Sequence, residues 1–232
     1  MQRLLGEIRR ADREWNLIPE GKKIALGISG GKDSMAMLML MSAYRRITPF
    51  SMVALTLIPD KDWDYSPIQA LCEREGIPFF PVGEGYMNIV RQSDKPCSLC
   101  ARVRRGTLVK AAAEQGCDRL ALAHNRDDML ETLLMNALRC GKIDTMRPLA
   151  LMEREDVTVI RPLINIKEQQ LERLCKKLNL PICKNPCPYD GHTGRREMKE
   201  MLEKLDRVIP GSCDSLATGS RSLFSRSDES ED

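Results

Sequence analysis

Residues 24–34 read IALGISGGKDS, an apolar run that ends in a glycine turn. The run 24–28 predicts a short buried strand, because uninterrupted apolar residues bounded by turn residues suit a strand that is covered on both faces. Residues 34–46 are rich in Met and Leu and predict a helix directly after the turn. A strand, a glycine turn and a helix in this order are typical of the ligand-binding edge of doubly wound α/β sheets.

The rest of the chain repeats this alternation, which predicts an α/β fold with a doubly wound, mostly parallel five-stranded sheet and helices on both faces. The expected strands are residues 24–28, 51–58, 78–82, 119–123 and 157–160. The expected helices are residues 3–15, 34–46, 66–75, 101–115, 127–138, 167–178 and 195–207. We expect an N-terminal helix within 1–20, one α/β domain over 21–208 and a disordered acidic tail over 209–232.

Composition narrows the classes of protein that fit the chain. Its 232 residues include 36 Lys and Arg against 33 Asp and Glu, a net charge of +3 that neither requires nor excludes a nucleic acid. The longest apolar run, Met35–Met41, is far shorter than the roughly 20 residues of a membrane span. Charges within residues 1–7 argue against a signal peptide. We therefore expect a cytoplasmic protein without a membrane partner, in which nine cysteines serve metal binding or chemistry rather than disulfides.

The glycine loop, residues 29–34, has the parts of an anion site. Gly30 and Gly31 let consecutive N–H groups point one way, and the following helix adds its N-terminal dipole. Lys32 supplies a positive charge, while Ser29 and Ser34 supply hydroxyl groups. The alternative is an ordinary Gly-Gly turn with a solvated lysine, which the flanking strand and helix make the weaker interpretation.

The glycine loop is not a Walker A loop, because Leu26 stands where that pattern needs glycine and Asp33 follows the lysine. Instead it resembles the signature of the PP-loop, or N-type, ATP pyrophosphatases. In that superfamily the loop grips the pyrophosphate end of ATP, and AMP is transferred to a substrate oxygen. The resemblance implies a PP-loop ATPase domain over residues 21–208. The ATP-binding residues that it implies in the loop are Ser29, Gly30, Gly31, Lys32, Asp33 and Ser34.

A second polar motif, residues 124–132, follows the expected strand 119–123 and reads HNRDDMLET. Asp127 and Asp128 suit Mg²⁺ held against phosphate oxygens, but they equally suit simple capping of the next helix. The motif is similar to the second motif of the tRNA-modifying branch of the PP-loop superfamily. This resemblance favours Mg²⁺ on Asp33 or Asp128, with Asp127 and His124 near the nucleotide. Arg161, after strand 157–160, is a weaker candidate for nucleotide contact.

Cysteines form the third constellation. Cys97 and Cys100 make a Cys-x-x-Cys pair, a spacing that binds a metal or cluster or forms a redox pair. Cys183 and Cys187 lie in a Pro-rich stretch without core periodicity, whereas the cysteines within or beside helices suit a core. No second Cys-x-x-Cys occurs, which disfavours a four-cysteine zinc ribbon.

Residues 96–106, PCSLCARVRRG, resemble the central motif of the tRNA 2-thiocytidine synthases and the related 2-thiouridine synthases. In that group three cysteines hold a [4Fe-4S] cluster whose fourth iron carries the transferred sulfur. The resemblance implies Cys97, Cys100 and Cys187 as the cluster ligands, with Cys183 in reserve for the third. It also implies catalytic roles for Asp33 and Asp128. Arg104 is a further catalytic candidate, because it lies four residues after Cys100 on the same helix face and can stabilise charge there.

The family resemblance implies an ATP-dependent sulfurtransferase that adenylates a pyrimidine C2 oxygen in tRNA and replaces it with sulfur. Its cofactors would be ATP, Mg²⁺ and the cluster, and its partners tRNA and sulfide or a sulfur donor such as a cysteine desulfurase; a homodimer is compatible with it. Basic residues around the pair support RNA phosphate contacts, although a solvated helix face is the common alternative. They are Lys95, Arg102, Arg104, Arg105 and Lys110. Two other functions remain: a PP-loop sulfurtransferase or ligase for a small molecule, and a non-catalytic redox-sensing nucleotide-binding protein.

Overall fold

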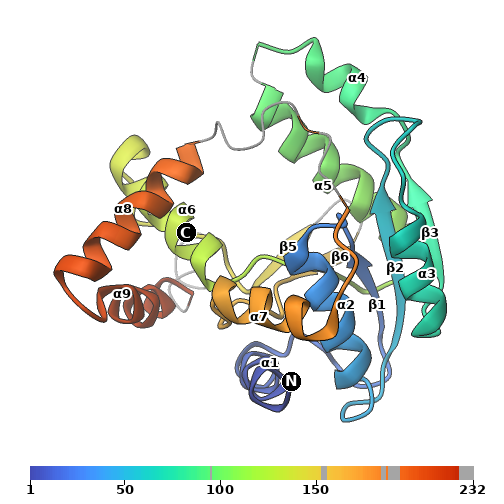
Figure 1. Cartoon of the computed structure of the whole chain (residues 1–232), viewed down its shortest axis with the longest axis horizontal. Helices are drawn as coiled ribbons and strands as arrows, with labels where there is room; N and C mark the ends of the chain where they lie inside the picture. Colours follow the sequence, from blue (N-terminus) through green and yellow to red (C-terminus); the bar gives the residue numbers. More distant parts are fainter. Residues whose placement is uncertain (95, 153–155, 184–186, 188–193, 225–232) are drawn as a thin grey trace, which may run out of the picture.

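The computed structural model describes residues 1–94, 96–152, 156–183, 187 and 194–224. Its centre is a six-stranded sheet in the order β3-β2-β1-β4-β6-β5 (Figure 1). The strands are β1 (Lys23–Gly27), β2 (Ser51–Leu57), β3 (Phe79–Val82), β4 (Arg119–Leu122), β5 (Leu149–Met152) and β6 (Val157–Ile160). All neighbouring pairs are parallel except β5 with β6, which is antiparallel. The predicted α/β class is confirmed, with six strands rather than five.

The sequence did not predict β5 because this strand is short and carries no alternation of apolar and polar residues. Its residues, Leu149–Met152, pair with β6 only, at the edge of the sheet, where Leu149 lies opposite Ile160. The pairing partner, rather than the local sequence, makes this segment a strand.

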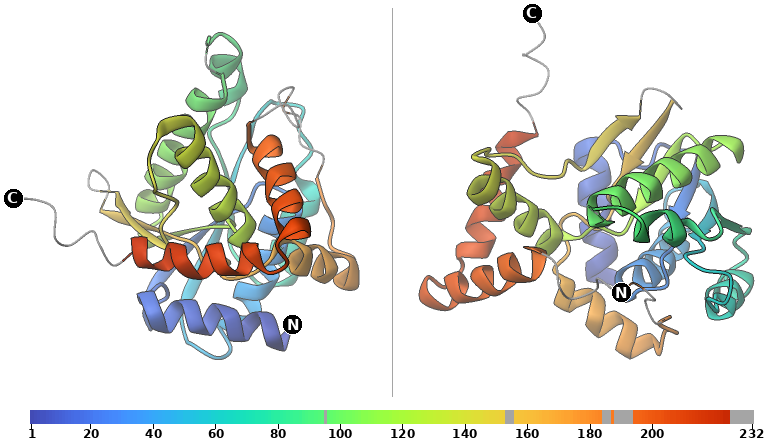
Figure 2. Two further views of the ribbon diagram at one scale, coloured as in Figure 1. Left: turned by 90° about the vertical axis from the view of Figure 1, so that its left-hand side faces the viewer. Right: turned by 90° about the horizontal axis from the view of Figure 1, so that it is seen from above.

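The helices cover both faces of the sheet (Figures 1 and 2). They are α1 (Gln2–Trp15), α2 (Lys32–Tyr44), α3 (Ser66–Arg74), α4 (Tyr86–Arg91), α5 (Pro96–Glu114), α6 (Arg126–Cys140), α7 (Glu168–Leu178), α8 (Gly194–Val208) and α9 (Ser212–Ser220), followed by the 3-10 turn η1 (Arg221–Leu223). Helix α5 begins five residues before the expected start, so Cys97 and Cys100 lie on its first two turns. No helix in the described ranges is both long and apolar enough to cross a bilayer.

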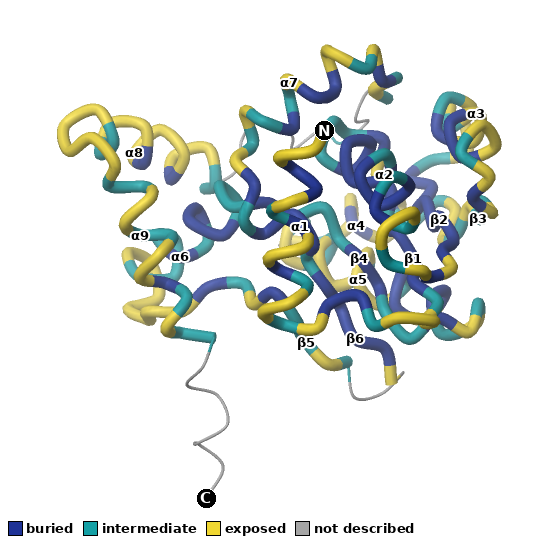
Figure 3. Tube along the Cα trace, turned by 90° about the horizontal axis from the view of Figure 1, so that it is seen from below, coloured by how far each residue is buried: buried dark blue, intermediate teal, exposed yellow. Residues whose placement is uncertain are grey.

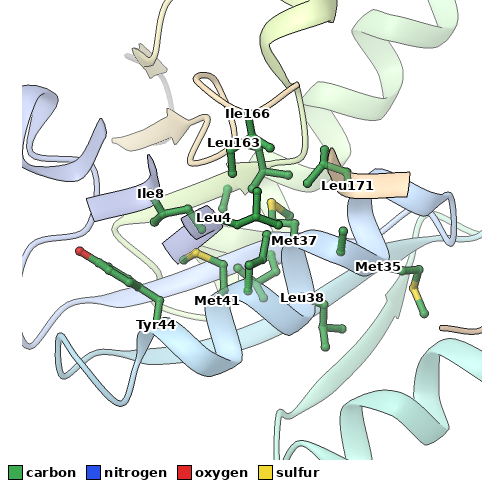
Figure 4. Packing of buried hydrophobic residues seen from close by; sticks show 14 of the residues in the cluster. Leu4, Ile8, Met35, Met37, Leu38, Met41, Tyr44, Leu163, Ile166 and Leu171 are labelled. Atoms are coloured by element: carbon green, nitrogen blue, oxygen red, sulfur yellow. The ribbon is translucent and has the colours of Figure 1, made fainter. Parts of the chain in front are cut away.

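Two hydrophobic clusters fix the faces of the sheet. Ile24 and Leu26 of β1 join the larger cluster with α1, α2 and α7, whereas Ala25 between them joins a smaller cluster beneath α5. This division follows from the two-residue period of a strand. Helix α2 is buried on almost all sides, which explains its Met- and Leu-rich sequence (Figure 3). Leu4 and Ile8 of α1 pack beside Met37 and Met41 of α2 (Figure 4).

The expectation of disorder over 209–232 is wrong for residues 212–223. Helix α9 packs against α6 and α8, and Leu216 and Ala217 contact the main hydrophobic cluster despite the Ser-rich composition. Asp214 adds ion pairs with Arg126 and Lys167. Residues 225–232 lie outside the described residues.

The strand order places the candidate site. The chain runs outward from β1 through β2 to β3, and then returns to the other side of β1 with β4. The loops that leave β1 and β4 therefore diverge at the carboxyl edge of the sheet, and ligands bind in the crevice that such a reversal opens. The glycine loop follows β1, and the motif that begins at His124 follows β4.

Candidate functional site

The glycine loop is shaped for an anion. Gly30 has φ +78°, a left-handed conformation that favours glycine, and Gly31 precedes the first turn of α2 without a side-chain cap. The N–H groups of that turn are therefore left for a ligand. The Ser34 hydroxyl donates to the Gly31 carbonyl at 2.8 Å and lies 3.2 Å from the Ser29 hydroxyl. These contacts fix the curl that the sequence predicted.

Two cysteines from the C-terminal third of the chain hold the loop from behind. The Cys183 N–H donates to the Gly30 carbonyl at 3.0 Å, and the Cys175 thiol donates to the Lys32 carbonyl at 3.1 Å. A Cβ added at Gly30 would lie 2.7 Å from the Cys183 Cβ. Both partners engage loop carbonyls rather than loop N–H groups.

Lys32 is the centre of a charged cluster. Its Nζ lies 3.1 Å from Asp33 Oδ2 and 2.6 Å from Glu168 Oε1, and Glu168 Oε2 accepts a bond from Lys199 Nζ at 2.5 Å. Burial on its own lowers the pKa of Lys32, but Glu168 and Asp33 raise it above its ordinary value, so Lys32 is charged. The sequence pattern does not place Glu168 or Lys199 at the glycine loop, because only the fold brings α7 and α8 there. The signal that the sequence offers for Glu168 is its position as an acidic residue at the start of an expected helix.

The aspartates of the second motif are engaged within the protein. The Asn125 side chain and Asp128 form a reciprocal cap of α6, in which Asp128 Oδ2 accepts from the Asn125 N–H at 2.9 Å. Asp128 Oδ1 lies 3.3 Å from an Arg195 nitrogen. Asp127 Oδ2 accepts from the Glu168 N–H at 2.7 Å and so caps α7. Both aspartates therefore cap helices, as the alternative interpretation expected, and Asp127 of α6 also links this helix to the start of α7.

Asp33 is the carboxylate best suited to a cation. Its Oδ1 is buried and has no hydrogen-bond partner, and burial raises the pKas of both Asp33 and Asp128. Each of the two carboxylates also feels the charge of Glu168, which places all three in one cluster. Among the described residues no three His, Cys, Asp or Glu form a ready metal site. Oxygen donors of this kind nevertheless fit Mg²⁺, which completes its octahedron with phosphate oxygens and water.

His124 and Arg161 lie at the carboxyl ends of β4 and β6. Burial, with the charges of Arg161 and Arg195, lowers the pKa of His124 to about 3, so its imidazole is neutral. Its Nδ1 and the Arg161 Nε are buried without hydrogen-bond partners in the described part of the chain. Burial and the nearby Arg105 lower the pKa of Arg161 to about 10. Unpartnered polar atoms at this edge are available to a ligand.

Cys100 and Cys187 lie close enough to interact electrostatically. Each influences the ionisation of Tyr86, and the charge of Cys187 acts on Cys100. The Tyr86 side chain is hydrogen-bonded to Cys100, and Arg104 lies beside the same thiol. Burial raises the pKa of Cys100, while Arg104 opposes that rise. Tyr86 belongs to α4, a helix that the sequence analysis did not predict.

Cys97 and the reserve ligand Cys183 lie in different places. Cys97 is exposed on the first turn of α5, three residues before Cys100, so it lies one turn away on the same helix side. Cys183 packs against Gly30 instead of the thiol pair. The described residues contain no complete three-cysteine site. The choice of Cys187 over Cys183 remains a prediction, and its position beside Cys100 supports it.

One short segment links the nucleotide loop to the thiols. Cys183 contacts Gly30, and Cys187 lies beside Cys100. Four residues of extended chain reach at most about 14 Å, so the backbone at these two points is within that distance. Contact between the nucleotide loop and the thiols through a common region stays a prediction.

Comparison with known proteins agrees with this arrangement. A family model described as a PP-loop domain matches residues 6–203. The tRNA-cytidine(32) 2-sulfurtransferase of Geobacter metallireducens is 35% identical over 212 residues, which cover 88% of this chain and 82% of that protein. The tRNA-cytidine(32) 2-sulfurtransferase of Aeromonas salmonicida is 36% identical over 227 residues, 94% of this chain and 74% of that protein.

Solved structures extend the comparison. The U34-tRNA thiolase NcsA from Methanococcus maripaludis, solved with its [4Fe-4S] cluster, is similar with a TM-score of 0.77 and 26% identity, over 97% of this chain and 81% of that one. An NH3-dependent NAD synthetase from Campylobacter jejuni, with a TM-score of 0.53 and 17% identity over 96% and 93% of the two chains, shares the fold. With the glycine loop, the acidic motif and the sheet order in place, the chain belongs to the PP-loop domain family.

Proposed function

We propose that the protein is an ATP-dependent tRNA sulfurtransferase that replaces the C2 oxygen of a pyrimidine with sulfur. The observation that carries the proposal is the contact of Cys183 with Gly30, only four residues before Cys187, whose charge acts on Cys100. A nucleotide loop and a thiol pair so close together suit a reaction with an activation step and a sulfur step. The names of the curated relatives and of the solved thiolase support the same chemistry.

The glycine loop performs the first step. The N–H groups at the start of α2 and the charge of Lys32 hold the phosphates of ATP, with Asp33 and Asp128 as the candidate Mg²⁺ ligands. The pyrimidine O2 attacks the α-phosphorus, the bond to the bridging oxygen breaks, and pyrophosphate leaves. AMP then remains on O2, which turns a poor leaving group into a good one.

The thiol side performs the second step. Cys97, Cys100 and Cys187 are the candidate ligands of a [4Fe-4S] cluster, whose fourth iron, when the cluster is bound, offers a position for sulfide. Sulfide sulfur adds to C2, the C2–O2 bond breaks, and O2 departs on AMP, so no net oxidation or reduction is needed. Arg104, beside Cys100, offsets negative charge that develops at this point. The proposed setting is the cytoplasm, where thiols stay reduced.

Iron content and product formation test the proposal together. Anaerobic reconstitution is expected to give about four irons per chain. Cys100→Ala and Cys187→Ala are expected to lose that iron and the thionucleoside, while Cys140→Ala, which alters an exposed cysteine on α6, keeps both. Iron that survives Cys187→Ala but disappears in Cys183→Ala would overturn the choice of ligand.

Pyrophosphate release separates the alternatives. With ATP and unmodified tRNA, the proposal predicts pyrophosphate and a 2-thiopyrimidine in the digested RNA. Release that needs no RNA would favour a small-molecule ligase or sulfurtransferase, and no release with any substrate would favour a redox-sensing binding protein. Supplying sulfide and a cysteine desulfurase separately identifies which of the two is the sulfur donor. Light scattering on the same preparations tests for a homodimer.

A further inference from the structure

Helix α5 presents two different faces. Cys97, Cys100 and Arg104 recur at helical spacing on the face that meets Cys187. A neighbouring face lines an open groove of about 430 Å³ that runs toward the edge strand β5. The groove is lined by Ser98, Ala101, Arg102, Arg105, Gly106, Val109 and Met152. Figure 2 shows α5 alongside the β5–β6 pair. One helix thus carries both the thiols and the groove.

The charge of this groove is positive. Arg102 and Arg105 are exposed, and neither forms an ion pair with any described carboxylate. Three residues apart on a helix, their Cβ atoms lie about 5–6 Å from each other, so two side chains can take adjacent anionic groups. Arg105 also acts electrostatically on Arg161 and His124, which connects the groove to the edge where β4 and β6 end.

A second open pocket on α1 is also lined by arginines, but it differs from the α5 groove in charge and in position. A pocket of about 490 Å³ on α1 is lined by Gly6, Arg9, Arg10, Arg13 and Glu14. It contains a carboxylate, and Arg10 is paired with Glu7 at 3.2 Å. It also belongs to the opposite face of the sheet from α5, as the two hydrophobic clusters establish. Its arginines are therefore partly neutralised and remote from the thiols.

We propose that the α5 groove binds the phosphodiester backbone of the substrate RNA next to the reacting base. The inference rests on the proposed function and locates the RNA on the protein. Backbone phosphates suit two exposed guanidinium groups, which bind phosphate oxygens in a forked geometry. An RNA strand held there runs past the first two turns of α5, where Cys97 and Cys100 lie.

Gly106 allows the groove to be blocked without disturbing the fold. A Cβ at Gly106 would meet no atom within 4 Å, and a helical glycine replaced by a longer residue favours the helix. Gly106→Glu places a carboxylate beside Arg102 and Arg105, while Gly106→Gln adds the same bulk without charge. Gly6→Glu is the matched control, because Gly6 is also helical, equally open and beside arginines.

The experiment measures binding of unmodified bulk tRNA between 50 and 200 mM salt, with ATP affinity measured in parallel. Gly106→Glu is expected to weaken tRNA binding about tenfold or more, with a smaller loss for Gly106→Gln and none for Gly6→Glu. Arg102→Gln and Arg105→Gln are each expected to lower the slope of log affinity against log salt by about 1. ATP affinity is expected to stay unchanged in all of them.

The outcomes separate the groove from the function. If Gly106→Glu and both arginine variants bind tRNA as tightly as the wild type, the groove is not the RNA site. The sulfurtransferase proposal would still stand. Equal losses in Gly106→Glu and Gly6→Glu would show only a general charge effect and also overturn the groove as the RNA site. A wild-type protein that neither binds tRNA nor thiolates it would remove the proposed function itself.

Discussion

The two glycines of the glycine loop are predicted to respond very differently to alanine. At Gly30, φ is +78° and a new Cβ would lie 2.7 Å from the Cys183 Cβ and 3.2 Å from the Ile68 Cδ1. Left-handed backbone costs a residue with a Cβ about 1–2 kcal/mol, and overpacking adds about 1–3 kcal/mol. Gly31 has φ −73°, and its added Cβ would make only an ordinary contact, 3.5 Å from the Ser29 Oγ.

Gly30→Ala is therefore expected to lower the free energy of unfolding by about 2–5 kcal/mol, and Gly31→Ala by less than about 0.5 kcal/mol. For a chain of this length the first change corresponds to a fall in melting temperature of roughly 10 °C. Urea denaturation and calorimetry measure both quantities. A Gly30→Ala protein as stable as Gly31→Ala would refute the assigned loop geometry.

A double mutant separates the two costs at Gly30. Cys183→Gly removes the Cβ that the new methyl group would meet, but it leaves the left-handed backbone as it is. Gly30→Ala combined with Cys183→Gly should therefore recover about 1–2 kcal/mol relative to the sum of the single changes. Strict additivity would show that Cys183 does not press on the loop.

Three further predictions concern charge. Lys32→Ala should weaken ATP binding at least about tenfold in calorimetric titration, because a charged partner of the phosphates is lost, and an unchanged affinity would exclude the loop as the phosphate site. Burial on its own raises the pKa of Glu168, but hydrogen bonds from Lys199 and Lys32 hold that pKa below its ordinary value. The ionised carboxylate therefore stabilises the fold above about pH 4.5, and this stabilisation is lost as the pH falls through the lowered pKa. Glu168→Gln should flatten the loss of stability at acid pH in urea denaturation, and an unchanged pH profile would contradict the ion pairs. Burial, with the charge of Asp128, raises the pKa of Glu131 to about 7, so the folded protein loses stability as the pH rises from about 4.5 through 7. Glu131→Gln should gain up to about 3 kcal/mol over the wild type at pH 8 and little at pH 4.5, and equal gains at both pH values would argue against a titrating carboxyl.

The local sequence predicts the strands and helices whose own residues favour that structure. The apolar run before Gly30 and the helix after it form as expected, and Val157–Ile160 is the expected strand. The strand Leu149–Met152 was missed because its identity depends on pairing with β6. Helix α9 was missed because its few apolar residues gain stability only by packing against α6 and α8.

The candidate site shows the same limit. Residues within one motif, such as Lys32 and Asp128, were found because their spacing carries the chemistry. Glu168 and Tyr86 were not found, because their roles come from partners on other elements. The contact between Cys175 and Lys32 joins residues 143 positions apart, which no local pattern reports.

The order of synthesis gives those distant contacts a further meaning. The glycine loop leaves the ribosome early, whereas the two cysteines that brace it are among the last parts of the domain to be made. A growing chain that ends before residue 175 has β1 and α2 but neither of the two cysteines that fix the curve between them. The braced form of the glycine loop therefore arises late in synthesis, with the same few residues that lead to Cys187.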